Sequence, residues 1–164
     1  MGSSATSIST AIPLYCATVR PEWVDYNGHL RDAFYLLICS YASDALLDTI
    51  GLDAATREQQ HSSVYTLESH INYLHEVKAG AEVRVSTQLL AHDAKRLHIY
   101  FSLHTLDQAE PVAVSEQMLL HVDVRGPKSA PFSASVLARV QAIAAAQQHL
   151  ARPAYVGRVM GLVK

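Results

Sequence analysis

One long segment without glycine or proline limits what this chain can fold into. Between Leu30 and Ile50 neither helix breaker occurs, and apolar side chains occupy almost every helical face rather than a single stripe. Such a helix must be buried by other elements of the fold, because almost all of its faces are apolar. Gly51 follows where a helix commonly ends. The pattern therefore predicts about five turns of helix that the rest of the molecule must cover.

Segments with a two-residue repeat follow this helix, after a polar connector over residues 53–63. The first segment is expected to present two sets of side chains on opposite faces of a strand. One set is Tyr65, Leu67, Ile71 and Tyr73, and the other is Thr66, Glu68, His70 and Asn72. Similar alternation predicts three more strands over residues 83–89, 97–103 and 112–124, with a turn near residues 92–95.

A short strand over residues 14–19 and an alanine-rich helix over residues 134–147 complete the predicted elements. Short turns between consecutive strands favour an antiparallel meander, and only the helix at 30–50 is long and apolar enough to cover its inner face. The order predicts an α+β hotdog fold, in which a sheet of about five strands wraps round a central helix. An α+β sandwich of another topology fits the periodicity nearly as well.

The amino-acid composition limits the possible domain organisation and partners of the chain. Residues 1–12 are small and hydroxyl-rich and are expected to form a flexible tail, while residues 13–164 form one domain.

The 13 basic residues against 15 acidic ones give no basic surface for nucleic acid. No segment has the apolar length that a membrane span needs. With 49% hydrophobic and 17% charged residues, part of the surface is expected to be covered by a partner subunit, and the predicted hotdog fold implies a homodimer or homotetramer. Cys16 and Cys39 are expected to be buried free thiols of a cytoplasmic protein.

The loop that enters the central helix carries the best candidates for chemistry. Its sequence is Asp25-Tyr26-Asn27-Gly28-His29. The first turn of a helix offers unpaired N–H groups and the positive end of the helix dipole, which suit an oxygen that gains negative charge. A carboxylate beside them could attack a carbonyl or activate water. These residues are also ordinary turn formers, so spacing alone leaves a purely structural role for Asp25 equally open.

The loop resembles the D-x-x-G-H signature of hotdog acyl-CoA thioesterases of the 4-hydroxybenzoyl-CoA thioesterase type. The resemblance covers about residues 14–160. The stretches VRPEWVDYNGHLRDAFYL, TLESHINYLHEVKAG and SEQMLLHVDVRGPKSAPF look most like the betainyl-CoA thioesterases of bacterial carnitine degradation. The resemblance implies hydrolysis of a short acyl-CoA, with betainyl-CoA cleaved to betaine and CoA, without a cofactor because CoA belongs to the substrate.

This resemblance also implies residue roles. The expected catalytic residues are Asp25, His29 and Asp32, and the expected substrate-binding residues are Trp23, Tyr26, Asn27 and Gly28. Asp25 would act as base or nucleophile, and the polarising N–H would come from around Asp32. His29 would either orient the loop carboxylate or only pack at the helix entrance. Trp23 and Tyr26 are the expected cage for a trimethylammonium group, which aromatic faces can bind.

Other polar residues have weaker functional interpretations. Arg31 either pairs with Asp25 or Asp32 or is simply solvated. Glu68 is expected to be structural, because relatives that use a catalytic glutamate place it on the central helix. Candidates for contact with the CoA phosphates are Lys95, Arg96, Arg125 and Lys128. The nine histidines form no metal-binding motif, so no metal is expected. A dehydratase or isomerase of the same fold, and a non-catalytic acyl-CoA-binding module, remain as rival functions.

Overall fold

The computed structural model describes residues 15–162, so the tail expected over residues 1–12 lies outside it. The elements in chain order are β1 (Tyr15–Thr18), the 3-10 turn η1 (Pro21–Trp23), α1 (Asp32–Thr49), α2 (Ala54–Gln59), β2 (Ser62–Tyr73), β3 (Glu82–His92), β4 (Arg96–Thr105), β5 (Ala113–Asp123), β6 (Lys128–Ser129) and α3 (Ala134–Gln147). The predicted central helix, the C-terminal helix and all five main strands are confirmed. The short helix α2 forms within the predicted connector, where Asp53 caps its first turn by accepting from the Thr56 N–H at 2.8 Å.

All strand pairs are antiparallel, in the order β1-β3-β4-β5-β2, with β6 also paired to β5. Strands β3, β4 and β5 form the expected meander. The expectation that β2 neighbours β3 is wrong, because residues 74–81 carry the chain across the sheet and leave β2 at the far edge beside β5. This placement brings the end of β2 next to the start of α1, since Tyr73 and Asp32 share a hydrogen bond.

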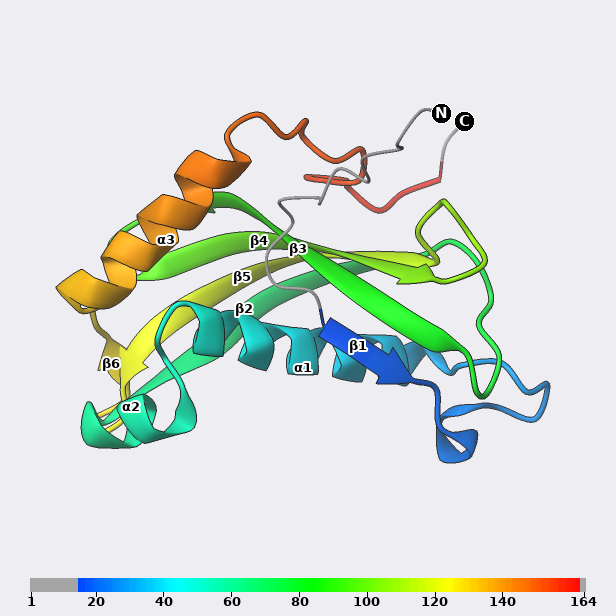
Figure 1. Cartoon of the computed structure of the whole chain (residues 1–164), viewed down its shortest axis with the longest axis horizontal. Helices are drawn as coiled ribbons and strands as arrows, with labels where there is room; N and C mark the ends of the chain where they lie inside the picture. Colours follow the sequence, from blue (N-terminus) through cyan, green and yellow to red (C-terminus); the bar gives the residue numbers. More distant parts are fainter. Residues whose placement is uncertain (1–14, 163–164) are drawn as a thin grey trace, which may run out of the picture.

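The central helix α1 runs along one face of the curled sheet (Figure 1). Its Ile38, Cys39 and Ala42 are fully buried and pack in one core with side chains from the sheet and from α3. The prediction that α1 is covered all round is wrong for a single chain, because Leu36 and Tyr41 of this helix remain 36% and 39% exposed.

A β-bulge in β2 reverses part of the predicted face assignment. The register shifts between Thr66 and Glu68, so one extra residue enters the strand and the alternation changes phase. Thr66 therefore faces α1, where it lines a groove with Leu36 and Ser40, rather than sharing a face with Glu68.

Cys39 is buried as expected, whereas Cys16, on the edge strand β1, is exposed. Neither cysteine forms a disulfide. No helix within the described residues is long and apolar enough to cross a membrane.

Candidate active site

The loop between η1 and α1 is a closed turn. The Asp25 N–H donates to the His29 carbonyl at 2.8 Å, and the Gly28 N–H donates back to the Asp25 carbonyl at 2.9 Å. Gly28 has a φ of 77°, a left-handed conformation that residues with a side chain rarely adopt. A Cβ at this position would meet no atom within 4 Å, so the glycine is needed for the turn conformation.

The side chain of Asp25 folds back onto its own loop. Oδ1 accepts the backbone N–H of Asn27 at 2.8 Å and that of His29 at 3.1 Å. The His29 N–H is the largest influence on the pKa of the Asp25 carboxyl and lowers it; desolvation opposes this effect, and the Asn27 N–H adds to it, so the pKa is lowered. The carboxylate is therefore ionised at neutral pH, and its Oδ2 accepts no hydrogen bond from residues 15–162.

The N-terminus of α1 lies beside this loop. The Arg31 N–H donates to the Trp23 carbonyl at 3.0 Å, and the Ala33 N–H is satisfied by the Asp32 side chain at 2.9 Å. Between them, the Asp32 N–H has no acceptor among the residues that the structure describes. The Arg31 Nε donates to the Val24 carbonyl at 3.3 Å, so this cation stabilises the loop backbone and forms no ion pair with Asp25 or Asp32.

The segment that follows β2 forms the opposite wall. The Leu30 N–H donates to the Val77 carbonyl at 2.7 Å and ties this segment to the loop. The His29 Nε2 lies 3.2 Å from Oε2 of Glu76. The imidazole of His29 therefore contacts Glu76, and it is the backbone of His29 that orients Asp25.

Together these segments enclose a cleft of about 710 Å³. Its lining includes Asp25, Asn27 and His29 from the loop, with Asp32 and Tyr35 from α1. The end of β2 and residues 74–76 complete the wall, with Gln108 from the loop between β4 and β5. The cleft thus joins a free carboxylate oxygen and a free helix N–H, the two groups that acyl transfer from a thioester requires.

Two tyrosines stand edge to face in this cleft. The ring centroids of Tyr35 and Tyr73 are 5.3 Å apart with an interplanar angle of 75°. The Tyr35 hydroxyl donates to the His75 carbonyl and the Tyr73 hydroxyl to the Asp32 carbonyl, each at 3.3 Å. Burial, and secondarily the nearby Glu76 carboxylate, raises the pKa of Tyr35 to about 12, so it acts as a neutral ring.

This fold and this site agree with the comparison to known families. A family model described as the thioesterase-like superfamily matches residues 19–140. The chain belongs to the thioesterase-like superfamily. The hotdog arrangement and the thioester hydrolase predicted from the sequence are thereby confirmed.

Members of this superfamily resemble the chain over nearly its whole length. A Pseudomonas aeruginosa protein named betainyl-CoA thioesterase is 57% identical over 155 residues, covering 94% of this chain and 98% of that protein. A Rhizobium meliloti protein named L-carnitine dehydrogenase/betainyl-CoA thioesterase is 40% identical over 98% of this chain, which spans 32% of that longer protein. A Staphylococcus aureus protein solved in complex with CoA is 26% identical, with a TM-score of 0.86 and coverage of 92% and 94% of the two chains.

Of the residues predicted to bind substrate, Asn27 lines the cleft, whereas Trp23, Tyr26 and Gly28 lie outside its lining. Trp23 is only 6% exposed and stacks on Phe34 with ring centroids 5.7 Å apart, while Arg20 covers its ring at 5.1 Å. Tyr26 is 93% exposed at the tip of the loop. In the single chain, the Trp23 ring is therefore packed against neighbouring side chains, whereas the Tyr26 ring is exposed to solvent.

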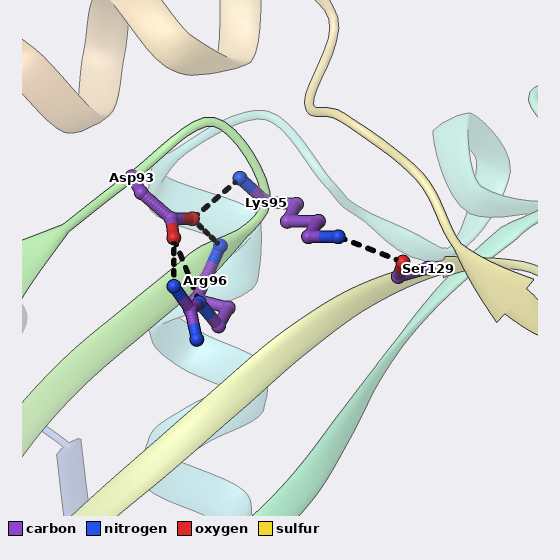
Figure 2. A network of polar contacts seen from close by, with 4 residues as sticks. All are labelled: Asp93, Lys95, Arg96 and Ser129. Atoms are coloured by element: carbon purple, nitrogen blue, oxygen red, sulfur yellow. Dashed lines mark hydrogen bonds and ion pairs between the residues drawn. The ribbon is translucent and has the colours of Figure 1, made fainter.

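The cations considered for CoA phosphates lie at the opposite end of the molecule, around β6 and the β3–β4 turn (Figure 1). Figure 2 shows Arg96 paired with Asp93 at 2.6 Å and Lys95 donating to Ser129 at 3.0 Å. Arg125 pairs with Asp123 at 2.6 Å. Each of these contacts is an ordinary surface interaction of a turn or strand end.

Glu68 lies on the other side of the sheet from α1. It lines a separate cavity of about 340 Å³ with His70, His98 and Glu116, so the structure does not bring it to the loop carboxylate. No group of three or more histidine, cysteine or acidic side chains within residues 15–162 has a geometry that could hold a metal ion.

Sequence reasoning missed His75, Glu76 and Gln108 as members of the cleft. Glu76 lies three residues beyond the last residue of β2, and only the position of β2 next to α1 brings it to His29. The one available signal was the pair of polar residues His75-Glu76 directly after an alternating strand.

Proposed function

We propose that this protein is an acyl-CoA thioesterase that hydrolyses betainyl-CoA to betaine and CoA. The carrying observation is that one cleft is lined by both Asp25, whose Oδ2 accepts no hydrogen bond within residues 15–162, and Asp32, whose N–H has no acceptor there. The relative named betainyl-CoA thioesterase supports the choice of substrate, because its identity of 57% extends over 94% of this chain.

The reaction follows from these two groups. The thioester carbonyl oxygen accepts the Asp32 N–H at the positive end of α1, which stabilises the negative charge that develops there. The Asp25 carboxylate promotes the attack of water on the carbonyl carbon, either by taking a proton from that water or by first forming an acyl intermediate that water cleaves. The C–S bond breaks, the CoA sulfur takes a proton, and betaine leaves as the carboxylate.

The rival dehydratase or isomerase is less well supported. Such an enzyme needs an acid–base pair that moves a proton on the acyl chain. The imidazole of His29 is directed to Glu76, at 3.2 Å, and forms no pair with Asp25. The histidine–carboxylate pair of this cleft therefore leaves out the loop carboxylate, and an Asp25 without a histidine partner suits attack on a thioester carbonyl better than proton transfer along the acyl chain.

The proposal extends to the setting of the reaction. We propose a cytoplasmic homodimer that acts without a cofactor, in which CoA enters as part of the substrate. The name of the Rhizobium meliloti relative joins a betainyl-CoA thioesterase to an L-carnitine dehydrogenase. This pairing supports a role in carnitine catabolism.

A thiol-release assay tests the function. The parent protein is supplied with betainyl-CoA and with a panel of straight-chain acyl-CoA esters, and free CoA is measured with a thiol reagent. We expect betainyl-CoA to have the highest kcat/KM, and Asp25→Asn to lower it by about 10²-fold or more. Asparagine keeps an acceptor oxygen for the Asn27 and His29 N–H groups, so the loop is retained.

Asp53→Asn is the matched control, because Asp53 also accepts a backbone N–H in an exposed turn but lies outside the cleft. It should behave as the parent. Undiminished thiol release by Asp25→Asn would remove Asp25 from catalysis. If the parent protein binds betainyl-CoA but releases no thiol, it is a binding module and not a thioesterase.

A further inference from the structure

The charge of the cleft is unusual for a site that receives an acyl-CoA. Asp25, Asp32 and Glu76 all line it, and no lysine or arginine among residues 15–162 does so. CoA itself is an anion, so this arrangement does not serve the nucleotide. Three carboxylates around a small space instead favour an acyl group that carries a positive charge.

The length of a betainyl group restricts where its cation can lie. A single methylene separates the thioester carbonyl from the quaternary nitrogen, so the cation must lie next to the carbonyl. If the carbonyl oxygen meets the Asp32 N–H, the cation falls beside the first turn of α1. Tyr73 reaches this turn, because its hydroxyl donates to the Asp32 carbonyl at 3.3 Å.

The two cleft tyrosines provide the aromatic faces that such a cation requires. A quaternary ammonium group has no N–H to donate, and it is bound through aromatic rings with a carboxylate near by. Tyr35 and Tyr73 stand edge to face at 5.3 Å, with each hydroxyl held by a backbone carbonyl. Tyr35 is 4% exposed and Tyr73 is 50% exposed, so one ring closes the end of the space and the other borders its opening.

We propose that Tyr35, Tyr73, Asp32 and Glu76 form a subsite for the quaternary ammonium group of the acyl chain. The inference rests on the proposed thioesterase function and adds the residues that select a cationic substrate. The rings contact the methyl groups, and the two carboxylates balance the charge. Trp23 is not part of this subsite, because its ring already stacks on Phe34 and lies under the guanidinium of Arg20.

A pair of isosteric esters tests the subsite. Betainyl-CoA and 3,3-dimethylbutanoyl-CoA have the same shape, because a quaternary carbon replaces the quaternary nitrogen, and they differ only in charge. The measured quantity is the ratio of their kcat/KM values. The parent should prefer the cation by at least about tenfold, which is within the range of cation–aromatic contacts that are shielded from water.

Variants then assign the preference to residues. Tyr73→Leu and Glu76→Gln should each lower the ratio several-fold, and Tyr73→Phe should keep it because the ring remains. The matched controls are Tyr65→Leu, an exposed tyrosine of the same strand outside the cleft, and Glu58→Gln in α2. Both should leave the ratio at the parental value. A general loss of folding would lower both rates and would leave the ratio unchanged.

The outcomes separate this inference from the proposed function. Equal hydrolysis of the two esters by the parent, or an unchanged ratio in both Tyr73→Leu and Glu76→Gln, overturns the subsite and leaves the thioesterase intact. Loss of the preference in Tyr73→Phe also overturns it, because the hydroxyl would then be responsible. If neither ester is hydrolysed, the proposed function fails. In that case, calorimetry measures the affinity of the protein for each of the two esters, and equal affinities reject the subsite.

Discussion

The carboxylate of Asp25 is oriented by backbone N–H groups of its own loop rather than by a cation. Two of these groups hold Oδ1, at 2.8 and 3.1 Å, and Oδ2 accepts no hydrogen bond within residues 15–162. The same bonds lower the pKa of Asp25 below its ordinary value of 3.8. A loop that positions a catalytic group through main-chain contacts depends on turn conformation, which explains the left-handed Gly28 within it.

The lowered pKa leads to a prediction for the pH dependence of hydrolysis. Because its pKa is lowered, Asp25 is more than half ionised at pH 3.8, and the midpoint of its protonation lies below that value. In a profile of kcat/KM for betainyl-CoA, the midpoint of the loss of activity caused by Asp25 should therefore lie below pH 3.8. Folding is followed in parallel by circular dichroism, so that acid unfolding is not counted as titration.

A loss of activity with its midpoint just above pH 3.8, in a range where circular dichroism shows the protein still folded, would contradict the lowered pKa of Asp25.

The residues of the site differ in how far the sequence could reveal them. Asp25, Asn27 and His29 form one local turn, so their mutual position follows from the order of residues and from turn chemistry. Tyr73 and Glu76 join them only because β2 ends beside α1, a long-range contact that periodicity does not encode. The edge-to-face contact between Tyr35 and Tyr73 depends on the same long-range approach of β2 to α1.

The elements themselves were predictable where one pattern runs without interruption. The helix predicted over residues 134–147 has the bounds of α3, and the one predicted over 30–50 differs from α1 by one or two residues at each end. The faces of β2 were not predictable, because the bulge between Thr66 and Glu68 leaves no mark in the alternation. The sheet order was missed for a related reason, since strand neighbours depend on long-range pairing rather than on sequence order.

Residues 148–162, which follow α3, form no helix or strand, yet they are anchored to the sheet. The Gly157 N–H donates to Oε2 of Glu116 at 2.7 Å, and His98 Nε2 lies 2.6 Å from Oε1 of the same residue. The Gln88 side chain also donates to the Ala151 carbonyl at 3.2 Å. Glu116, on β5, is thus one polar anchor of this segment, and Gln88, on β3, is another.

Removal of the Glu116 carboxylate should release the segment. Glu116→Ala removes a hydrogen bond to a charged acceptor, which stabilises by about 1.5 kcal/mol or more. We expect tryptic cleavage after Arg158 to become about tenfold faster, because cleavage follows the population of the open segment. Glu110→Ala, in an exposed loop, is the control and should be cleaved at the parental rate. Equal cleavage rates in the two variants would show that the other contacts hold the segment.

At the scale of the whole molecule, one edge of the sheet and one side of α1 remain uncovered. Within residues 15–162, β2 pairs only with β5, and its Leu67 is 55% exposed. A groove of about 250 Å³ between α1 and β2 is lined by Leu36 and Thr66. Apolar surface beside an unpaired strand edge is suited to a second copy of the chain.

A twofold axis at the middle of β2 would pair the two β2 strands antiparallel. The start of the partner's β2 would then lie beside the end of this one, where Tyr73 lines the cleft. Each cleft would gain a second wall from the partner subunit, which would exclude water from a site that is open in one chain. Dimerisation and activity should therefore be coupled.

Leu67→Asp tests this coupling by placing a charge at the edge that pairs. We expect the parent to have a mass near twice the 17.9 kDa of one chain by light scattering, and the variant to shift towards the monomer with kcat/KM lowered about tenfold or more. Leu106→Asp introduces the same charge at a leucine that is 58% exposed but lies outside β2, and it should leave the mass unchanged. A monomeric parent with full activity, or a Leu67→Asp variant that stays dimeric, would mean that β2 is not the contact. A monomeric variant with parental activity would mean that one chain alone completes the cleft.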